Sequence, residues 1–107
     1  MISATIFKTK ADAILGFQVK NHGSTHVCAA VSMLTINTVN SIEKLTPDAK
    51  FICDWDENGG FIKFLLNNDS QRETGAGILL DAMVLGLTSV SQEHPNDMKI
   101  KVKDVTA

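Results

Sequence analysis

Two residues able to carry covalent chemistry, a histidine and a cysteine, lie close together near the N-terminus of this 107-residue chain. His22 follows a segment of alternating polarity, and Cys28 begins a segment whose apolar residues have helical spacing. A thiol in the first turn of a helix loses its proton more easily than elsewhere, because unpaired N–H groups and the helix dipole favour the thiolate. A neighbouring imidazole completes a nucleophile–base pair. We therefore predict Cys28 as a nucleophile and His22 as its general base.

Other interpretations of these residues stay open. A cysteine in an apolar segment such as Val27–Val31 is often a small buried side chain. His26 is the alternative base, although two residues before Cys28 it is expected to point from another side of the first turn, or to be a solvated loop residue. Ser32 follows Cys28 by four residues and shares its helix face, where it could bond within the site or to the backbone at Cys28.

The connection between the histidine and the cysteine is short. Five residues separate His22 from Cys28, an ordinary length for a link between a strand and a helix. The chain must reverse direction there, and we expect Gly23 to supply the unusual backbone dihedral angles. Ser24 or Thr25 is expected to cap the helix that follows.

Alternating polarity elsewhere predicts the strands that must position this pair. Residues 9–12 and 56–60 lie between strand pairs, and the Asn-Gly pair of the second segment favours a tight hairpin turn. Lysines at alternate positions of the last strand are typical of a protected sheet edge. The predicted strands are 2–6, 15–20, 51–55, 61–66 and 99–103.

Apolar residues at helical spacing predict two helices. The first runs from about Val27 to Leu45, and Thr46-Pro47 ends it. The second contains the apolar positions from Ala76 to Val90, follows a capping box at 70–73, and ends at His94-Pro95, where His94 would interact with the helix dipole. The order β-β-α-β-β-α-β predicts one α+β domain over 1–107: a mostly antiparallel five-stranded sheet with two amphipathic helices covering its faces.

Composition narrows the classes of function. A net charge of −2 and only six aromatic residues (one Trp, five Phe) predict no direct nucleic-acid binding. No apolar run is long enough for a membrane span, and no signal peptide is apparent, so we expect a cytoplasmic protein. The cysteines have no metal-type spacing: Cys53 is expected in the core, and the acids at 54, 56 and 57 in a solvated turn. We predict no metal and no cofactor.

The residues of the thiol segment resemble those of a known family, the ribosomal-processing cysteine proteases called Prp. The resemblance is carried by Val-Cys-Ala-Ala-Val-Ser at 27–32 after an upstream histidine, by Asn-Ser-Ile at 40–42 and by Asp-Glu-Asn-Gly-Gly at 56–60, and it extends over nearly the whole chain. It implies a homodimeric α/β endopeptidase that removes the N-terminal extension of a large-subunit ribosomal protein. It also implies His22 and Cys28 as the catalytic pair and Ser32 as the family's serine one helical turn later.

This chain also differs from the family pattern near the thiol. The family's longer, glycine-containing loop between histidine and cysteine is shortened here, and Thr25-His26 replaces the Asp-Ile pair that usually precedes Val-Cys. These differences motivate an alternative function, a non-catalytic binding or assembly module for the same ribosomal partner.

Overall fold

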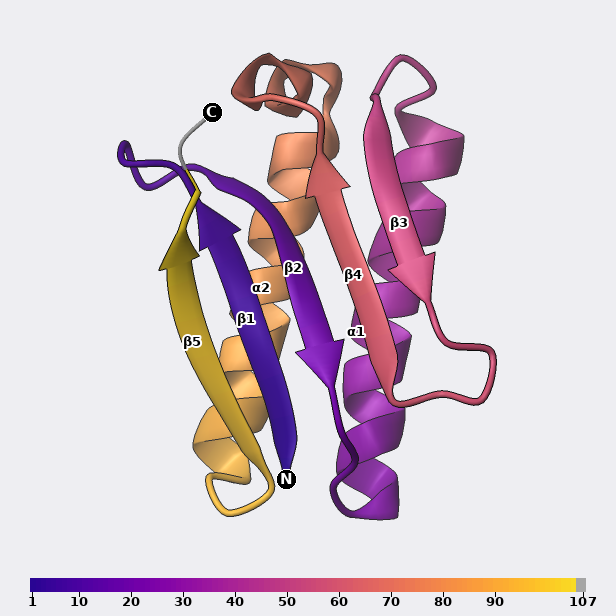
Figure 1. Ribbon diagram of the computed structural model, residues 1–107, viewed down its shortest axis with the longest axis vertical. Helices are drawn as coiled ribbons and strands as arrows, with labels where there is room; N and C mark the ends of the chain where they lie inside the picture. The colour runs from indigo at the N-terminus through magenta and orange to yellow at the C-terminus, as the bar shows by residue number, and fades with distance from the viewer. Residues whose placement is uncertain (106–107) are drawn as a thin grey trace.

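The computed structural model describes residues 1–105 as a sheet backed by two long helices (Figure 1). The elements, in chain order, are β1 (Ile2–Lys8), β2 (Ile14–Lys20), α1 (Thr25–Leu45), β3 (Phe51–Trp55), β4 (Phe61–Leu66), the 3₁₀ helix η1 (Asp69–Thr74), α2 (Ala76–Glu93) and β5 (Met98–Asp104). The predicted order of strands and helices is confirmed, with η1 as an addition.

The five strands form one sheet in the order β3-β4-β2-β1-β5. Neighbours pair antiparallel except β1 and β5, which run parallel from Ile2 opposite Met98 to Lys8 opposite Asp104. The sheet is therefore mixed, with the predicted antiparallel majority, and the lysine-bearing last strand lies at an edge as expected. Strands that run parallel cannot be joined by a hairpin and need a crossover connection, which the chain between β1 and β5 supplies.

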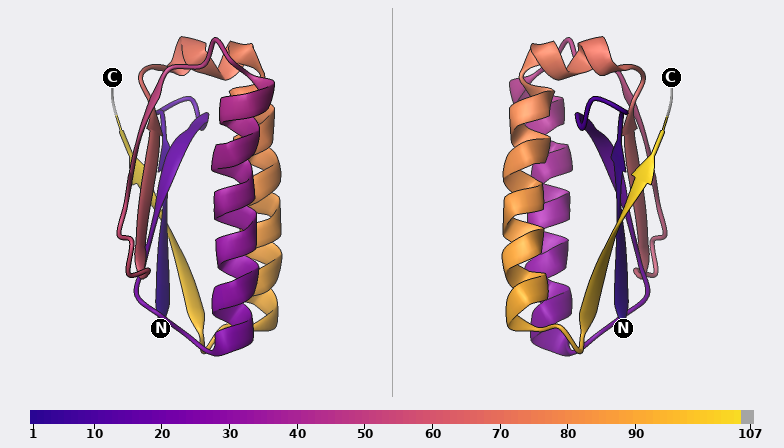
Figure 2. Two further views of the ribbon diagram at one scale, coloured as in Figure 1. Left: turned by 90° about the vertical axis from the view of Figure 1, so that its right-hand side faces the viewer. Right: turned by 90° about the vertical axis from the view of Figure 1, so that its left-hand side faces the viewer.

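Both helices lie on the same face of the sheet, as the two side views show (Figure 2). The prediction that the helices would cover both faces is wrong. The physical reason is the sheet's one-sided pattern: Ile2, Ala4 and Ile6 of β1 are buried against the helices, while Ser3 and Thr5 between them point to the other side. These outward polar positions offer little for a helix to bury.

The hairpin turns form where the sequence predicts them. Between β1 and β2, Thr9 and Ala13 close the turn through a backbone hydrogen bond of 2.9 Å. Between β3 and β4, Gly59 and Gly60 both adopt positive φ, at 83° and 85°. Glycine takes this conformation without a steric penalty, which makes the pair suitable for the turn.

The predicted start of the second helix is wrong. Residues 70–73 form no capping box but belong to η1, and α2 begins at Ala76 after Gly75 in a left-handed conformation with φ of 107°. The Arg72 guanidinium is held by the Ile14 carbonyl oxygen at 2.6 Å and by the Asp81 carboxylate at 2.8 Å. These distant partners fix the 3₁₀ turn, and a local capping pattern cannot reveal them.

Candidate active site

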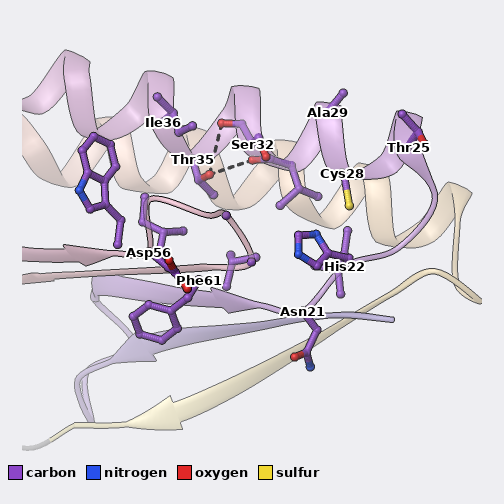
Figure 3. A pocket seen from close by; sticks show the side chains of 17 residues that line it. Asn21, His22, Thr25, Cys28, Ala29, Ser32, Thr35, Ile36, Asp56 and Phe61 are labelled. Atoms are coloured by element: carbon purple, nitrogen blue, oxygen red, sulfur yellow. Dashed lines mark hydrogen bonds between the residues drawn. The ribbon is translucent and has the colours of Figure 1, made fainter.

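A cavity of about 400 Å³ opens on the helix side of the sheet (Figure 3). One wall comes from the first half of α1, and the other from the ends of β2 and β4 and the β3–β4 turn. His22 and Cys28 both line it, although they belong to the loop after β2 and to α1. The remaining lining side chains are mostly apolar: they include Val19, Val31, Ile36, Trp55, Phe61 and Ile62.

Cys28 lies at the end of the first turn of α1 and is half-buried. Its backbone N–H donates to the Ser24 carbonyl at 2.9 Å, which is the first hydrogen bond of the helix. Its sulfur accepts a hydrogen bond from the Gly23 N–H at 3.2 Å and lies 3.6 Å from the Gly23 carbonyl oxygen. The loop before the helix therefore folds over the thiol.

The His22 ring points into the same cavity as the Cys28 sulfur (Figure 3). Its position depends on the β3–β4 turn: a Cβ added to Gly60 would lie 2.8 Å from His22 Nε2 and 3.4 Å from Cε1. Since Cβ atoms essentially never approach so closely, the ring occupies space that only glycine leaves open. A backbone hydrogen bond joins the two segments at the same place: the Asn21 N–H donates to the Gly60 carbonyl at 2.9 Å.

The reversal between β2 and α1 uses a different residue from the one predicted. Asn21, not Gly23, has the positive φ, at 72°, so the expectation for Gly23 is wrong. Asparagine tolerates this region better than most side chains do. Gly23 serves packing instead, since a Cβ there would lie 3.0 Å from the Asp97 carbonyl oxygen and 3.3 Å from the side chain of Ile2.

The loop is fastened to the connection between α2 and β5. Ser24 occupies the predicted N-cap position, but its side chain makes no cap hydrogen bond and donates to the Asp97 carboxylate at 3.2 Å. The Asp97 carbonyl accepts from the Ile2 N–H at 2.8 Å. One residue of a distant turn thus contacts both the loop and the first strand.

The structure separates the two candidate bases. His26 does not line the cavity; its ring meets that of His94 edge to face, with centroids 5.4 Å apart. His94 is the C-cap residue of α2, where its expected position is confirmed. His22 is therefore the histidine that shares a cavity with the thiol.

Ser32 lines the cavity one turn beyond Cys28, as its spacing predicts. Sequence reasoning missed the next position on this side of the helix, Thr35, which is 1% exposed and donates to the Val31 carbonyl at 2.9 Å. It also missed Trp55, a cavity residue that is 67% exposed. The one sequence signal of a further role for the β3–β4 turn is Gly60, a second glycine directly after Asn58-Gly59.

The second cysteine lies apart from this cavity. Cys53 is half-buried on the inward side of β3 and packs against the core. Burial raises the pKa of its thiol, and the carboxylates of Asp54 and Glu43 raise it further. Within residues 1–105, no three His, Cys, Asp or Glu side chains gather as metal ligands, and no helix could cross a membrane.

The sequence and the fold of this chain have counterparts in known proteins. A family model described as cysteine protease Prp matches residues 1–99. The chain belongs to the Prp family of cysteine proteases. The ribosomal processing cysteine protease Prp of Bacillus subtilis (strain 168) is 25% identical over 108 residues, covering 94% of this chain and 96% of that protein.

Solved structures share the Prp fold described above. SMU.848 from Streptococcus mutans is 30% identical and has a TM-score of 0.84, with 98% of this chain and 96% of that chain covered. The Prp protease of S. aureus, in complex with a covalently linked product peptide, has a TM-score of 0.86 at 23% identity, with 96% of this chain and all of that chain covered.

Proposed function

We propose that this member of the Prp family is a cysteine endopeptidase that removes the N-terminal extension of a large-subunit ribosomal protein. Cys28 is the nucleophile and His22 the general base. The observation that carries the proposal is that these two side chains, from different elements, face one cavity. The enzyme is proposed to act in the cytoplasm and, as the family resemblance implies, as a homodimer.

The proposed reaction passes through a covalent intermediate. His22 takes the thiol proton, and the Cys28 thiolate attacks the carbonyl carbon of the scissile peptide bond. The C–N bond then breaks, and protonated His22 gives its proton to the leaving amine, which leaves a thioester on Cys28. Water attacks this thioester while His22 accepts the water's proton, and the carboxylic product departs as that proton returns to the thiolate.

Backbone N–H groups are the proposed stabilisers of the oxyanion. The first N–H groups of a helix have no intrahelical partner, and α1 begins only three residues before Cys28. The Gly23 N–H is a further candidate, since it already lies 3.2 Å from the sulfur. A carbonyl attacked by this sulfur would thus meet donors from the loop and from the helix.

One observation supports the alternative, a non-catalytic binding module. Within residues 1–105, the hydrogen-bond partners of the Cys28 sulfur are the backbone groups of Gly23 and not the His22 ring. The thiol hydrogen must therefore turn from the Gly23 carbonyl oxygen toward the His22 ring before His22 can take it. A module that only binds would keep this contact when the ribosomal protein docks.

The test is incubation of the purified protein with the precursor ribosomal protein of the same organism, read by mass spectrometry. We expect a single cut that Cys28→Ala and His22→Ala each abolish, while Cys53→Ala and His26→Ala, the matched controls, still cleave. Binding of the precursor without cleavage by the wild-type protein would support the binding module. Cleavage by Cys28→Ala would contradict the proposed mechanism.

A further inference from the structure

The sheet face that turns away from the helices carries a concentration of positive charge. It is the face toward the viewer in Figure 1. The outward strand positions hold five of the chain's ten basic residues but one of its twelve acidic residues, Asp54. We name the five outward lysines the lysine face: they are Lys20, Lys63, Lys99, Lys101 and Lys103.

Strand register arranges these charges in rows across the sheet. Lys99 is opposite Ser3, which is opposite Lys20. In the next row, Lys101 and Lys63 are separated by two polar residues, Thr5 on β1 and Gln18 on β2. Alternate residues on a strand lie about 7 Å apart and neighbouring strands about 4.8 Å, so the charges of these two rows form a lattice with hydrogen-bond donors between them. Lys103 lies in a third row, opposite Phe7 of β1.

Protection of a sheet edge explains only part of the lysine face. Lysines on β5 prevent edge-to-edge pairing, as expected for an edge strand. Lys20 and Lys63, however, belong to β2 and β4, which are paired on both sides. An interior strand has no edge to protect, so edge protection does not account for these two lysines.

The lysine face also lacks internal neutralisation. In the part of the chain that the structure describes, the ion pairs are Lys8–Asp12 and Arg72–Asp81, and neither includes a lysine of this face. Lys63 extends over the ring of Phe7, with Nζ 5.6 Å from the ring centre. Its opposite residue on β3 is Asp54, the one acidic side chain of the face.

We propose that the lysine face is a docking surface for the phosphate backbone of RNA. Lysines supply the charge, and the hydroxyl and amide groups between them can donate to phosphate oxygens. The net charge of −2 predicts no nucleic-acid contact only because it averages two unlike faces. The choice of RNA over an acidic protein rests on the proposed function, since a ribosomal protein is a substrate that is surrounded by RNA once assembled.

The lysine face and the candidate active site are on opposite sides of the sheet. The strand residues that line the cavity include inward ones such as Val19 and Ile62, with Phe61 opposite Lys20 as an outward one, so RNA on the outward face leaves the cavity open. The central strands present no exposed aromatic ring on which bases could stack. Binding should therefore depend on salt and not on sequence.

The test measures binding of a labelled duplex RNA about 20 base pairs long, at about 50 mM salt, to the Cys28→Ala protein. Cleavage activity plays no part, so failure of the proposed protease function does not affect the result. The first variant combines Lys20→Gln, Lys63→Gln and Lys101→Gln. Its matched control combines Lys10→Gln, Lys44→Gln and Lys50→Gln, which removes the same charge outside the lysine face.

We expect the first variant to weaken RNA binding about 10-fold or more and to reduce the salt dependence, while the control changes affinity less than about 2-fold. Asp54→Asn should strengthen binding, because it removes the one opposing charge. Equal weakening by both triple variants, absence of RNA binding by the starting protein, or equally good competition by polyglutamate would overturn the proposal. The last result would identify an acidic protein as the partner.

Discussion

The Ser24 hydroxyl donates a hydrogen bond of 3.2 Å to the carboxylate of Asp97, which lies 73 residues further along the chain. Through this bond the turn between α2 and β5 holds the loop that carries His22 and Gly23. The same aspartate accepts the Ile2 N–H through its carbonyl. The short loop next to the thiol is therefore positioned from outside, by a residue that does not line the cavity.

Asp97→Ala should reduce turnover more than substrate affinity. Loss of the carboxylate frees Ser24, and the loop then holds His22 less accurately, so we expect kcat to fall about 10-fold with little change in KM. Steady-state cleavage of a precursor peptide measures both constants. Asn96→Ala, an exposed change in the same turn, is the control and should leave kcat within about 2-fold. A loss of kcat that Asn96→Ala reproduces would contradict the positioning role of Asp97.

Gly60→Ala should abolish activity through His22. The new Cβ would lie 2.8 Å from Nε2, so the ring must leave its place. Gly59→Ala is a close control, because Gly59 also has positive φ but its added Cβ would meet the ring at an ordinary 3.9 Å. Both variants should lose about 1 kcal/mol of unfolding free energy from backbone strain. Cleavage assays and urea unfolding should show similar destabilisation but loss of activity only for Gly60→Ala; equal activity in the two variants would contradict this role.

Cys53 should react with iodoacetamide more slowly than Cys28. Burial raises the pKa of the Cys53 thiol, and the charges of Asp54 and Glu43 raise it further, so less Cys53 thiolate is present at pH 8. The alkylation rate of Cys53 should therefore keep increasing above the pH at which the rate of an ordinary thiol levels off. Asp54→Asn removes one raising charge and should speed Cys53 alkylation, whereas Glu57→Gln in the adjacent turn should not. Mass spectrometry of each modified cysteine gives both rates. Faster labelling of Cys53 than of Cys28 at pH 8 would refute the prediction.

Arg72→Ala should destabilise the fold without touching the cavity. The guanidinium joins η1 to the Ile14 carbonyl and to Asp81, and its loss removes the side-chain donor to this part-buried carbonyl oxygen. We expect a loss of about 2 kcal/mol in urea unfolding. Asp81→Ala removes only the half-exposed ion pair and should cost at most ~1 kcal/mol. Equal losses would show that the ion pair, not the Ile14 contact, is the larger contribution.

Local patterns predicted the elements but not the contacts between them. The apolar spacing from Val27 onward is a property of the segment itself, and α1 indeed runs over Thr25–Leu45. The candidate pair could be found for the same reason, since His22 and Cys28 are separated by one short loop. The partner of Ser24 could not, because nothing near the serine indicates Asp97.

Competition between local and distant interactions explains the wrong predictions. The capping pattern at 70–73 is outweighed by the distant partners of Arg72. Gly23 was expected to make the turn, but the turn falls on Asn21, because the Asn21 N–H pairs with Gly60 while Gly23 must pack against Asp97. Each outcome depends on segments that meet only after folding.

Placement of both helices on one side gives the two surfaces of the sheet different freedom to change during evolution. A substitution at an inward position such as Val19 disturbs buried packing and the shape of the cavity together. A substitution at an outward position such as Gln18 alters only what the solvent or a partner meets. Descendants of this chain can therefore exchange one binding partner for another without rebuilding the candidate active site.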